Sequence, residues 1–205
     1  MITIENVDVY GFDVAIRAMR NSFDSWEKSD SKWKNGEYVL GKDDLALMRK
    51  LIDAGDSHAK FARLITVTCD ITAPRYWWTE FDTYKVGTVR CSCSTMHTIT
   101  RRPFTVDDFS TDGGLGTHNA LAYVVCTLNI MRERYLETGD KAEWRALIQL
   151  LPQSYNQRAT VELNYQVLRN ICRQRKGHRL SEWAEFIGWS EGLPYAEELI
   201  ICENM

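Results

Sequence analysis

Hydrophobic and polar residues change their spacing several times along the first half of the chain. Residues 2–9 alternate as in a half-buried strand, and a helical spacing follows from about Phe12 to Trp26. The polar segment 29–41 predicts turns, after which Asp43 and Asp44 open a helix that Gly55 closes. Residues 62–72 are rich in β-branched side chains and predict a second strand, and the proline at 74 favours a short helix after it.

The second half of the chain is predominantly helical in its pattern. A loop region is expected from Val86 through the glycines at 113–116, and helical spacing then covers 118–138, 140–151, 156–176 and 179–188. Because helices are many and strands few, the pattern predicts the α+β class. No repeat, low-complexity tract or proline- and glycine-rich linker interrupts the sequence, so a single domain over 1–205 is expected.

Composition and charge narrow the range of functions. The hydrophobic fraction of 44% and the charged fraction of 26% are typical of soluble globular proteins. A net charge of −3 gives no general attraction to a nucleic acid polymer, although a local basic pocket would not show in this total. The apolar runs are shorter than a membrane span and the first residues do not resemble a signal peptide, so we expect a cytoplasmic protein with no membrane partner. Six scattered cysteines favour reduced thiols, and four single histidines do not indicate a metal site.

The segment 151–179 carries the most chemical information. One stripe of its predicted helix combines three apolar and two polar residues: Val161, Asn164, Leu168, Ile171 and Arg175. Such a stripe faces inward, where an unpaired charge is costly, so Arg175 needs an anionic or carbonyl partner. Two interpretations follow. Arg175 forms an ion pair within the chain and the asparagines form buried hydrogen bonds, or Arg158 and Arg175 meet a phosphate or a pyrimidine carbonyl in a ligand cleft.

The end of the same segment is basic and leaves a similar choice. Its cations are Arg173, Arg175, Lys176 and Arg179. Such a run is commonly a solvated helix end, where positive charge is favourable, and it can also line an anion pocket.

Six positions of this segment resemble the C-terminal pattern of the flavin-dependent thymidylate synthases, the ThyX family. Without a gap they are Leu151, Pro152, Arg158, Asn164, Asn170 and Arg175, and residues 55–74 look like the family's strand that leads into Ala-Pro. The resemblance implies the ThyX fold, helix-rich with a small, mainly antiparallel sheet, and a homotetramer with active sites shared between subunits. It also implies that the two arginines face the nucleotide and that the two asparagines face flavin or the cleft around it.

The family's Arg-His-Arg signature is replaced in this chain. The corresponding positions are Thr83, Tyr84 and Lys85, so part of the donor set that would hold FAD, the one cofactor that the resemblance implies, is missing. Several aromatic residues surround these positions and can stack on a base or pack in the core: Tyr76, Trp77, Trp78, Phe81 and Tyr84. Tyr84, Lys85 and Arg90 therefore join Arg158, Arg175, Asn164 and Asn170 as candidate nucleotide-binding residues.

Cys93 is the candidate nucleophile, because it stands where the family has a serine near the reacting base. Activation of its thiol needs a nearby cation, which Lys85 or Arg90 would supply, whereas no base stands at a fixed spacing. An ordinary packed thiol is the other interpretation, and a general base at His97 is a further candidate role.

Three functions are compatible with these residues. The first is a nucleotide-binding ThyX-like protein that sequesters a nucleotide or nucleotide-derived signal without synthase turnover, as phage-encoded immune-evasion binders do. The second is a divergent FAD-dependent enzyme that methylates dUMP with methylenetetrahydrofolate or modifies another pyrimidine nucleotide. The third is a structural subunit whose arginines only form ion pairs. Retained arginines and asparagines beside a replaced flavin motif favour the first.

Overall fold

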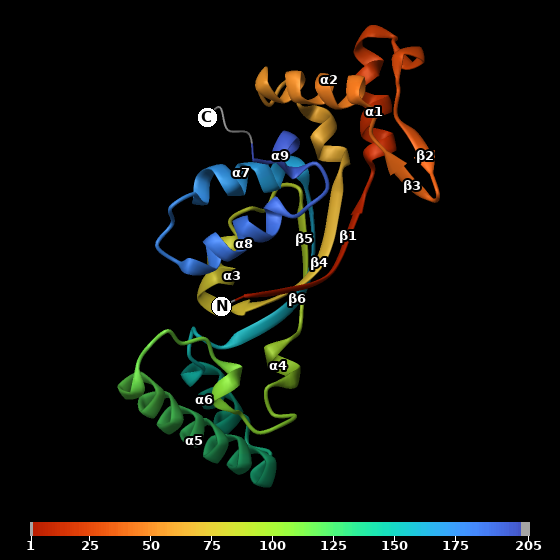
Figure 1. Cartoon of the computed structure of the whole chain (residues 1–205). Coiled ribbons are helices and arrows are strands. Elements are labelled where there is room, and N and C mark those ends of the chain that lie inside the picture. Colours follow the sequence, from red (N-terminus) through yellow and green to blue (C-terminus); the bar gives the residue numbers. More distant parts are fainter. Residues whose placement is uncertain (1, 202–205) are drawn as a thin grey trace. The chain divides into compact units, whose positions relative to one another are not determined.

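The computed structural model describes residues 2–201 and divides them between two compact units (Figure 1). Of the described residues, unit 1 contains 2–3, 71–83 and 91–159, and unit 2 contains 4–70, 84–90 and 160–201. No helix in this part of the chain combines the length and the apolar character that a bilayer crossing requires.

A four-stranded sheet runs in the order β1-β4-β6-β5, and each of its strands contributes residues to both units. The strands are β1 (Thr3–Tyr10), β4 (Thr66–Pro74), β5 (Thr88–Ser92) and β6 (Asn156–Asn164). In β4 every second side chain is buried, as the period of two in a pleated strand requires: Val67, Cys69, Ile71 and Ala73. The combination of many helices with a small antiparallel sheet confirms the predicted α+β class.

The helix predicted over 156–176 is wrong in its first half. Residues 156–164 form β6, in which Ala159, Val161 and Leu163 are buried and the residues between them are exposed. The helix α7 (Tyr165–Arg175) begins only after Asn164, which is its N-cap. Ala159 and Leu163 fit both a helical stripe and a strand face, and pairing within the sheet decided the outcome.

Unit 1 has its core where two helices pack together. These are α5 (Leu115–Thr138) and α6 (Lys141–Leu150), and the Asp140 side chain caps α6 by accepting a hydrogen bond from Ala142 N at 2.8 Å. The buried cluster consists of Ile99, Phe104, Phe109, Leu121, Val125, Leu128, Leu147 and Leu151. The unit also contains α3 (Arg75–Phe81), α4 (Thr95–Thr98) and the short 3-10 helix η4 (Val106–Asp108). The expected loop over 86–116 is therefore more regular than its sequence suggested, because it contains β5, α4 and η4.

Unit 2 is built from helices around the ends of the strands. They are α1 (Phe12–Arg20), α2 (Lys42–Asp53), α7, α8 (Ser181–Glu191) and α9 (Ala196–Leu199), with the 3-10 helices η1 (Asn21–Phe23), η2 (Trp26–Lys28) and η3 (Lys60–Leu64). The helix predicted from Phe12 to Trp26 thus ends at Arg20 and continues as short turns. The Tyr165 ring packs edge-on against Phe12, with ring centroids 5.7 Å apart, and its hydroxyl donates to Pro194 O at 2.7 Å.

The polar segment 29–41 forms a hairpin of β2 (Lys32–Lys34) and β3 (Glu37–Val39), which pair antiparallel. Asn35 and Gly36 connect the two strands with φ values of 50° and 86°. Positive φ at both central residues is typical of the type I′ turn that an Asn-Gly pair favours. The sequence thus contained a hairpin signal, and turns alone were expected there.

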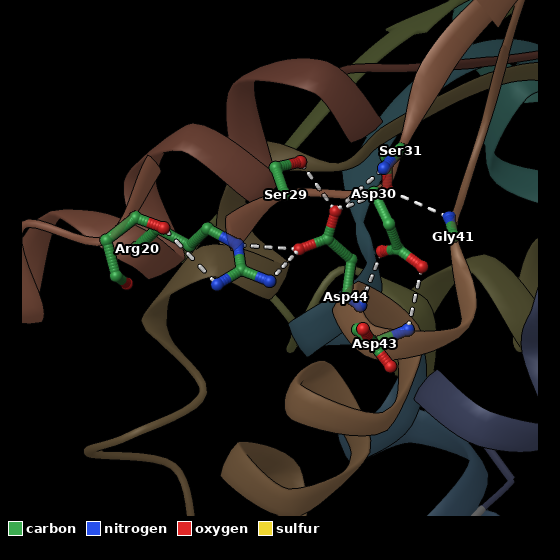
Figure 2. A network of polar contacts seen from close by, with 8 residues as sticks. Arg20, Ser29, Asp30, Ser31, Gly41, Asp43 and Asp44 are labelled. Carbon is green, nitrogen blue, oxygen red and sulfur yellow. Dashed lines mark hydrogen bonds and ion pairs between the residues drawn. The ribbon is translucent and has the colours of Figure 1, made fainter. Parts of the chain in front are cut away.

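A buried carboxylate, Asp44 at the start of α2, joins α2 to the segment that follows α1 (Figure 2). Its Oδ1 accepts from Arg20 Nε at 2.7 Å, and its Oδ2 accepts from the hydroxyls of Ser29 and Ser31, each at 2.6 Å. Burial raises the pKa of Asp44, but these hydrogen bonds outweigh it and hold the pKa below the ordinary value of an aspartate. Asp30 adds a cap by accepting from Asp44 N at 3.0 Å.

Candidate functional site

The Arg175 side chain lies in a cluster of aromatic and polar groups at the end of α7. Its Nε donates to the Tyr84 hydroxyl at 2.9 Å, and one of its terminal nitrogens lies 3.2 Å from His178 Nε2. The guanidinium carbon is 4.7 Å from the centroid of the Trp183 ring and 5.5 Å from that of Tyr84. A cation at such distances from aromatic faces is attracted by their quadrupoles. We call Tyr84, Arg175, His178 and Trp183 the cation–aromatic cluster.

Three segments of unit 2 position this cluster. Arg175 is the last residue of α7, and the turn after it contains Gly177 with a φ of +71°, a conformation that glycine adopts at little cost. The turn brings back His178, whose backbone N–H donates to Arg175 O at 3.0 Å. Trp183 comes from the first turns of α8 and is fully buried, so its ring is a fixed surface for the guanidinium.

The two asparagines of the resemblance make hydrogen bonds within the chain. Asn164 Oδ1 accepts from Val167 N at 3.0 Å and thereby caps α7. Asn170 Oδ1 accepts from Gln166 Nε2 and from a terminal nitrogen of Arg173, both at 3.3 Å. Both asparagines are half-buried, and their part in a ligand site stays a prediction.

A cavity of about 470 Å³ opens beside α7 and α8 and includes part of the cluster in its wall. We call it the α7–α8 cavity. Its lining residues are Arg169, Cys172, Arg173, Arg175, Lys176, Gly177, His178, Ala184, Ile187, Gly188, Glu191, Ile200 and Ile201. Four of these are arginines or lysines, and Glu191 is the only carboxylate among the described residues that line it. A volume of this size is within the range of small-molecule sites.

Arg169 is the most deeply placed cation of this wall, with 4% of its side chain exposed. One terminal nitrogen lies 3.2 Å from Asp56 Oδ1 and the other donates to Ile52 O at 3.3 Å. Its Nε has no hydrogen-bond partner in the structure. A buried donor without an acceptor is unfavourable, and this nitrogen is closed to solvent as well, so the Arg169 side chain carries a cost of desolvation in this position.

The thiol in the cavity wall is not an activated nucleophile. Burial raises the pKa of Cys172 to about 11, and the nearby Glu191 acts in the same direction. The thiolate is the reactive form, so Cys172 is protonated and inert near neutral pH. All five cysteines in the described part of the chain are free thiols, whereas Cys202 lies outside it.

The remaining candidate residues lie outside the cation–aromatic cluster. Lys85 is exposed in the turn after Tyr84, and Arg90 is partly buried in β5. Arg158 is exposed on β6 and Cys93 is exposed after β5, and both belong to unit 1. Cys93 N donates to Arg158 O at 2.8 Å, so their backbones are neighbours. Their participation in a ligand site remains a prediction.

His97 is exposed beside Ser94, and three of the aromatic residues of α3 pack in the core. His97 Nδ1 lies 2.8 Å from Ser94 Oγ, one turn earlier in the chain. Trp77, Trp78 and Phe81 are buried, and the Trp77 and Phe81 rings stack with centroids 5.1 Å apart. Core packing, the more ordinary of the two roles considered for these rings, is the one found. Within residues 2–201, no group of three or more His, Cys, Asp or Glu side chains could hold a metal ion.

The fold that carries this site is the fold of the flavin-dependent thymidylate synthases. The chain is similar to ThyX from Helicobacter pylori in complex with FAD and dUMP: over 96% of this chain and 97% of that one, the TM-score is 0.75 at 17% identity. A second structure of that enzyme with the same ligands matches over 100% of both chains, with a TM-score of 0.76 at 17% identity. The UMP/dUMP methylase PolB from Streptomyces cacaoi, bound with 5-Br dUMP, covers 84% of this chain and 77% of its own, with a TM-score of 0.55 at 16% identity. No family model and no curated protein matches the sequence.

Sequence reasoning missed two parts of this site. Trp183 was not named as a candidate site residue. It stands eight positions after Arg175, and a turn at Gly177 between them can bring its ring back to the arginine. Arg169 and Cys172 were missed as well, although the spacing i, i+3, i+4, i+7 places them on one helical face with Arg173 and Lys176, which the sequence had already marked as possible lining of an anion pocket. That face lines the cavity, and the spacing was available in the sequence.

Proposed function

We propose that this protein binds a nucleotide or a nucleotide-derived signal in the α7–α8 cavity and does not carry out the synthase reaction. The observation that carries the proposal is the position of Arg175, which is held against Trp183 at 4.7 Å and lines a cavity with three further cations. Guanidinium groups donate paired hydrogen bonds to phosphate oxygens. Apolar residues in the same wall, Ile187 and Ile200 among them, offer a surface for a base.

The residues at the flavin motif fit FAD poorly. At these positions a threonine, a tyrosine and a lysine replace the two arginines and the histidine that the family signature supplies. The Tyr84 hydroxyl already accepts from Arg175 Nε at 2.9 Å, so this group belongs to the cation–aromatic cluster. A nucleotide without a flavin group therefore fits these residues better than FAD does.

A pyrimidine-nucleotide methylating enzyme is the second candidate, because the H. pylori synthase and PolB share the fold and are bound to such nucleotides in the structures compared. The protein purified from its expression host separates the two candidates. We expect a colourless protein that shows no dUMP-dependent oxidation of NADPH. Bound flavin together with turnover would overturn the binding-only proposal.

Nucleotide binding itself is tested by the shift in melting temperature with uracil and adenine nucleotides, since a ligand that binds the native state stabilises it. Arg175→Ala should abolish the shift. Arg175→Lys, which keeps the charge and loses the planar fork, should lower the affinity for the nucleotide at least tenfold. Arg179→Ala is the matched control, because Arg179 is exposed and lies outside the cavity wall. Circular dichroism establishes that each variant is folded, and a shift that persists in folded Arg175→Ala would refute the assignment.

The proposal includes the cytoplasmic homotetramer with sites shared between subunits that the resemblance implies. Lys85, Arg90, Arg158 and Cys93 are then candidate contacts in the assembled protein. Light scattering coupled to size exclusion tests the assembly directly, and a monomer that binds nucleotide with full affinity would exclude shared sites.

A further inference from the structure

We propose that a groove beside β1 and the β2–β3 hairpin, within unit 2, binds an extended, basic peptide segment of a partner protein. The groove has a volume of about 790 Å³ and shares no lining residue with the α7–α8 cavity. We call it the β1 groove. The proposal is independent of the nucleotide-binding function, because it is carried by the edge of β1, by two exposed aromatic rings and by the negative charge of the groove wall.

The β1 groove follows the edge of a strand. Residues 7–10, four consecutive positions of β1, line it. Successive side chains of a strand point to opposite faces of the sheet, so a groove that touches four in a row runs along the edge of the strand. In the order β1-β4-β6-β5, β1 is an end strand, and β4 is its only strand neighbour among the described residues (Figure 1). The backbone groups on the outer edge of β1 can therefore pair with an added strand.

Two aromatic rings lie open in the wall of the β1 groove. Trp33 is 62% exposed and Tyr10 is 54% exposed. The Trp33 ring packs edge-on against Tyr38, with centroids 5.3 Å apart, and this contact orients it. Tryptophan and tyrosine are enriched among the residues that contribute most to binding at protein interfaces, and their faces attract arginine and lysine. The rings therefore offer anchoring surfaces to a partner with cationic side chains.

The charge of the β1 groove specifies the chemistry of the partner. Asp8, Asp13 and Glu37 line the groove, and the described residues of its wall include no lysine, arginine or histidine. None of the three carboxylates forms an ion pair with another residue of the described chain. Lys34 stands opposite Glu37 in the hairpin register but lies outside the wall. A peptide with arginine or lysine at alternate positions complements both the carboxylates and the strand edge.

Fluorescence anisotropy on the full-length protein tests the proposal with labelled ten-residue peptides. The probe alternates arginine with valine, and its control alternates glutamate with valine. We expect the arginine peptide to bind at least tenfold more tightly than the glutamate peptide. Hydrogen exchange followed by mass spectrometry should then show slower exchange of the amides of residues 7–10, because an added strand protects the edge with which it pairs.

Two pairs of variants locate the binding. Trp33→Ala should weaken binding of the arginine peptide at least tenfold, whereas Phe23→Ala should leave it unchanged, because Phe23 is 85% exposed and lies outside the groove wall. Asp8→Asn should weaken binding at least threefold. Glu27→Gln removes the same charge from an exposed position outside the wall and should leave binding unchanged. Circular dichroism establishes that each variant is folded.

The other possible results each overturn the proposal. Equal binding of the two peptides, or equal losses in Asp8→Asn and Glu27→Gln, would show that no local site recognises the cations. Binding of spermine as tightly as the arginine peptide would assign the groove to small organic cations. A wild-type protein that binds no peptide, together with a smaller assembly of Trp33→Ala in light scattering, would show that a second copy of the chain covers the groove. Protection from exchange elsewhere in the chain would refute pairing with β1.

Discussion

Replacement of Asp44 by asparagine should destabilise the protein strongly, because it leaves a buried cation without its anion. Arg20 is 5% exposed and Asp44 is fully buried, and their charged atoms lie 2.5 Å apart. Removing one partner of such a pair typically costs about 3–5 kcal/mol. For a chain of this size that loss corresponds to a fall in melting temperature of roughly 6–20 °C.

Chemical denaturation followed by circular dichroism measures the change in the free energy of unfolding. Asp43→Asn is the matched control, because Asp43 is exposed in the same first turn of α2. It should change stability by less than about 0.5 kcal/mol, as an exposed surface substitution does. If the free energy of unfolding of Asp44→Asn is within about 1 kcal/mol of the wild-type value, the ion pair does not hold α2 to the segment after α1, and the reasoning fails.

The effect of Asp44 should depend on pH in a defined direction. Its folded pKa is held below the value of about 4 of an unfolded aspartate, so its stabilisation is complete above that pH. As the pH falls through the folded pKa, the carboxylate gains its proton and the contribution is lost. The difference between the wild type and Asp44→Asn should therefore shrink in acid, and a difference that stays constant down to pH 2 would contradict this assignment.

Two further predictions concern the surroundings of the site. Gly87→Ala should lower the free energy of unfolding by about 1–2 kcal/mol and weaken nucleotide binding, because Gly87 has a φ of +81° and an added Cβ would lie 2.8 Å from Asn164 Nδ2. A variant with the melting temperature and the affinity of the wild type would contradict this prediction. Iodoacetamide at pH 7.5 should alkylate the exposed Cys91 and spare Cys172, since burial raises the pKa of Cys172 to about 11. Mass spectrometry of the labelled peptides measures the order of labelling, and early labelling of Cys172 would contradict this prediction.

Elements with a single period were predictable from the sequence, whereas those that fit two periods were not. The strand at 2–9 and the helices α2, α5, α6 and α8 follow one pattern and were found near their expected bounds. In β6, Ala159 and Leu163 fit a helical stripe as well as a strand face. Asn164, read as an amide inside a helix, is the N-cap at which α7 begins. A capping residue is a boundary signal of the sequence itself, so this error was avoidable.

The limits on predicting the site are different, because they lie in contacts between distant residues. The spacing on α7 predicted an anionic or carbonyl partner for Arg175. The structure places the Tyr84 hydroxyl against its Nε, 91 residues away in the chain, and no period or motif connects the two positions. No sequence pattern predicts the pairing of Arg20 with Asp44 either, because 24 residues separate them. Sequence patterns therefore indicate which side chains need a partner, whereas the packing of α7 against α8 and the turn after α3 decides which groups satisfy them. Because those contacts hold Arg175 by its Nε and by its flat face, they fix its guanidinium at the cavity wall, which is the arrangement that a phosphate site requires.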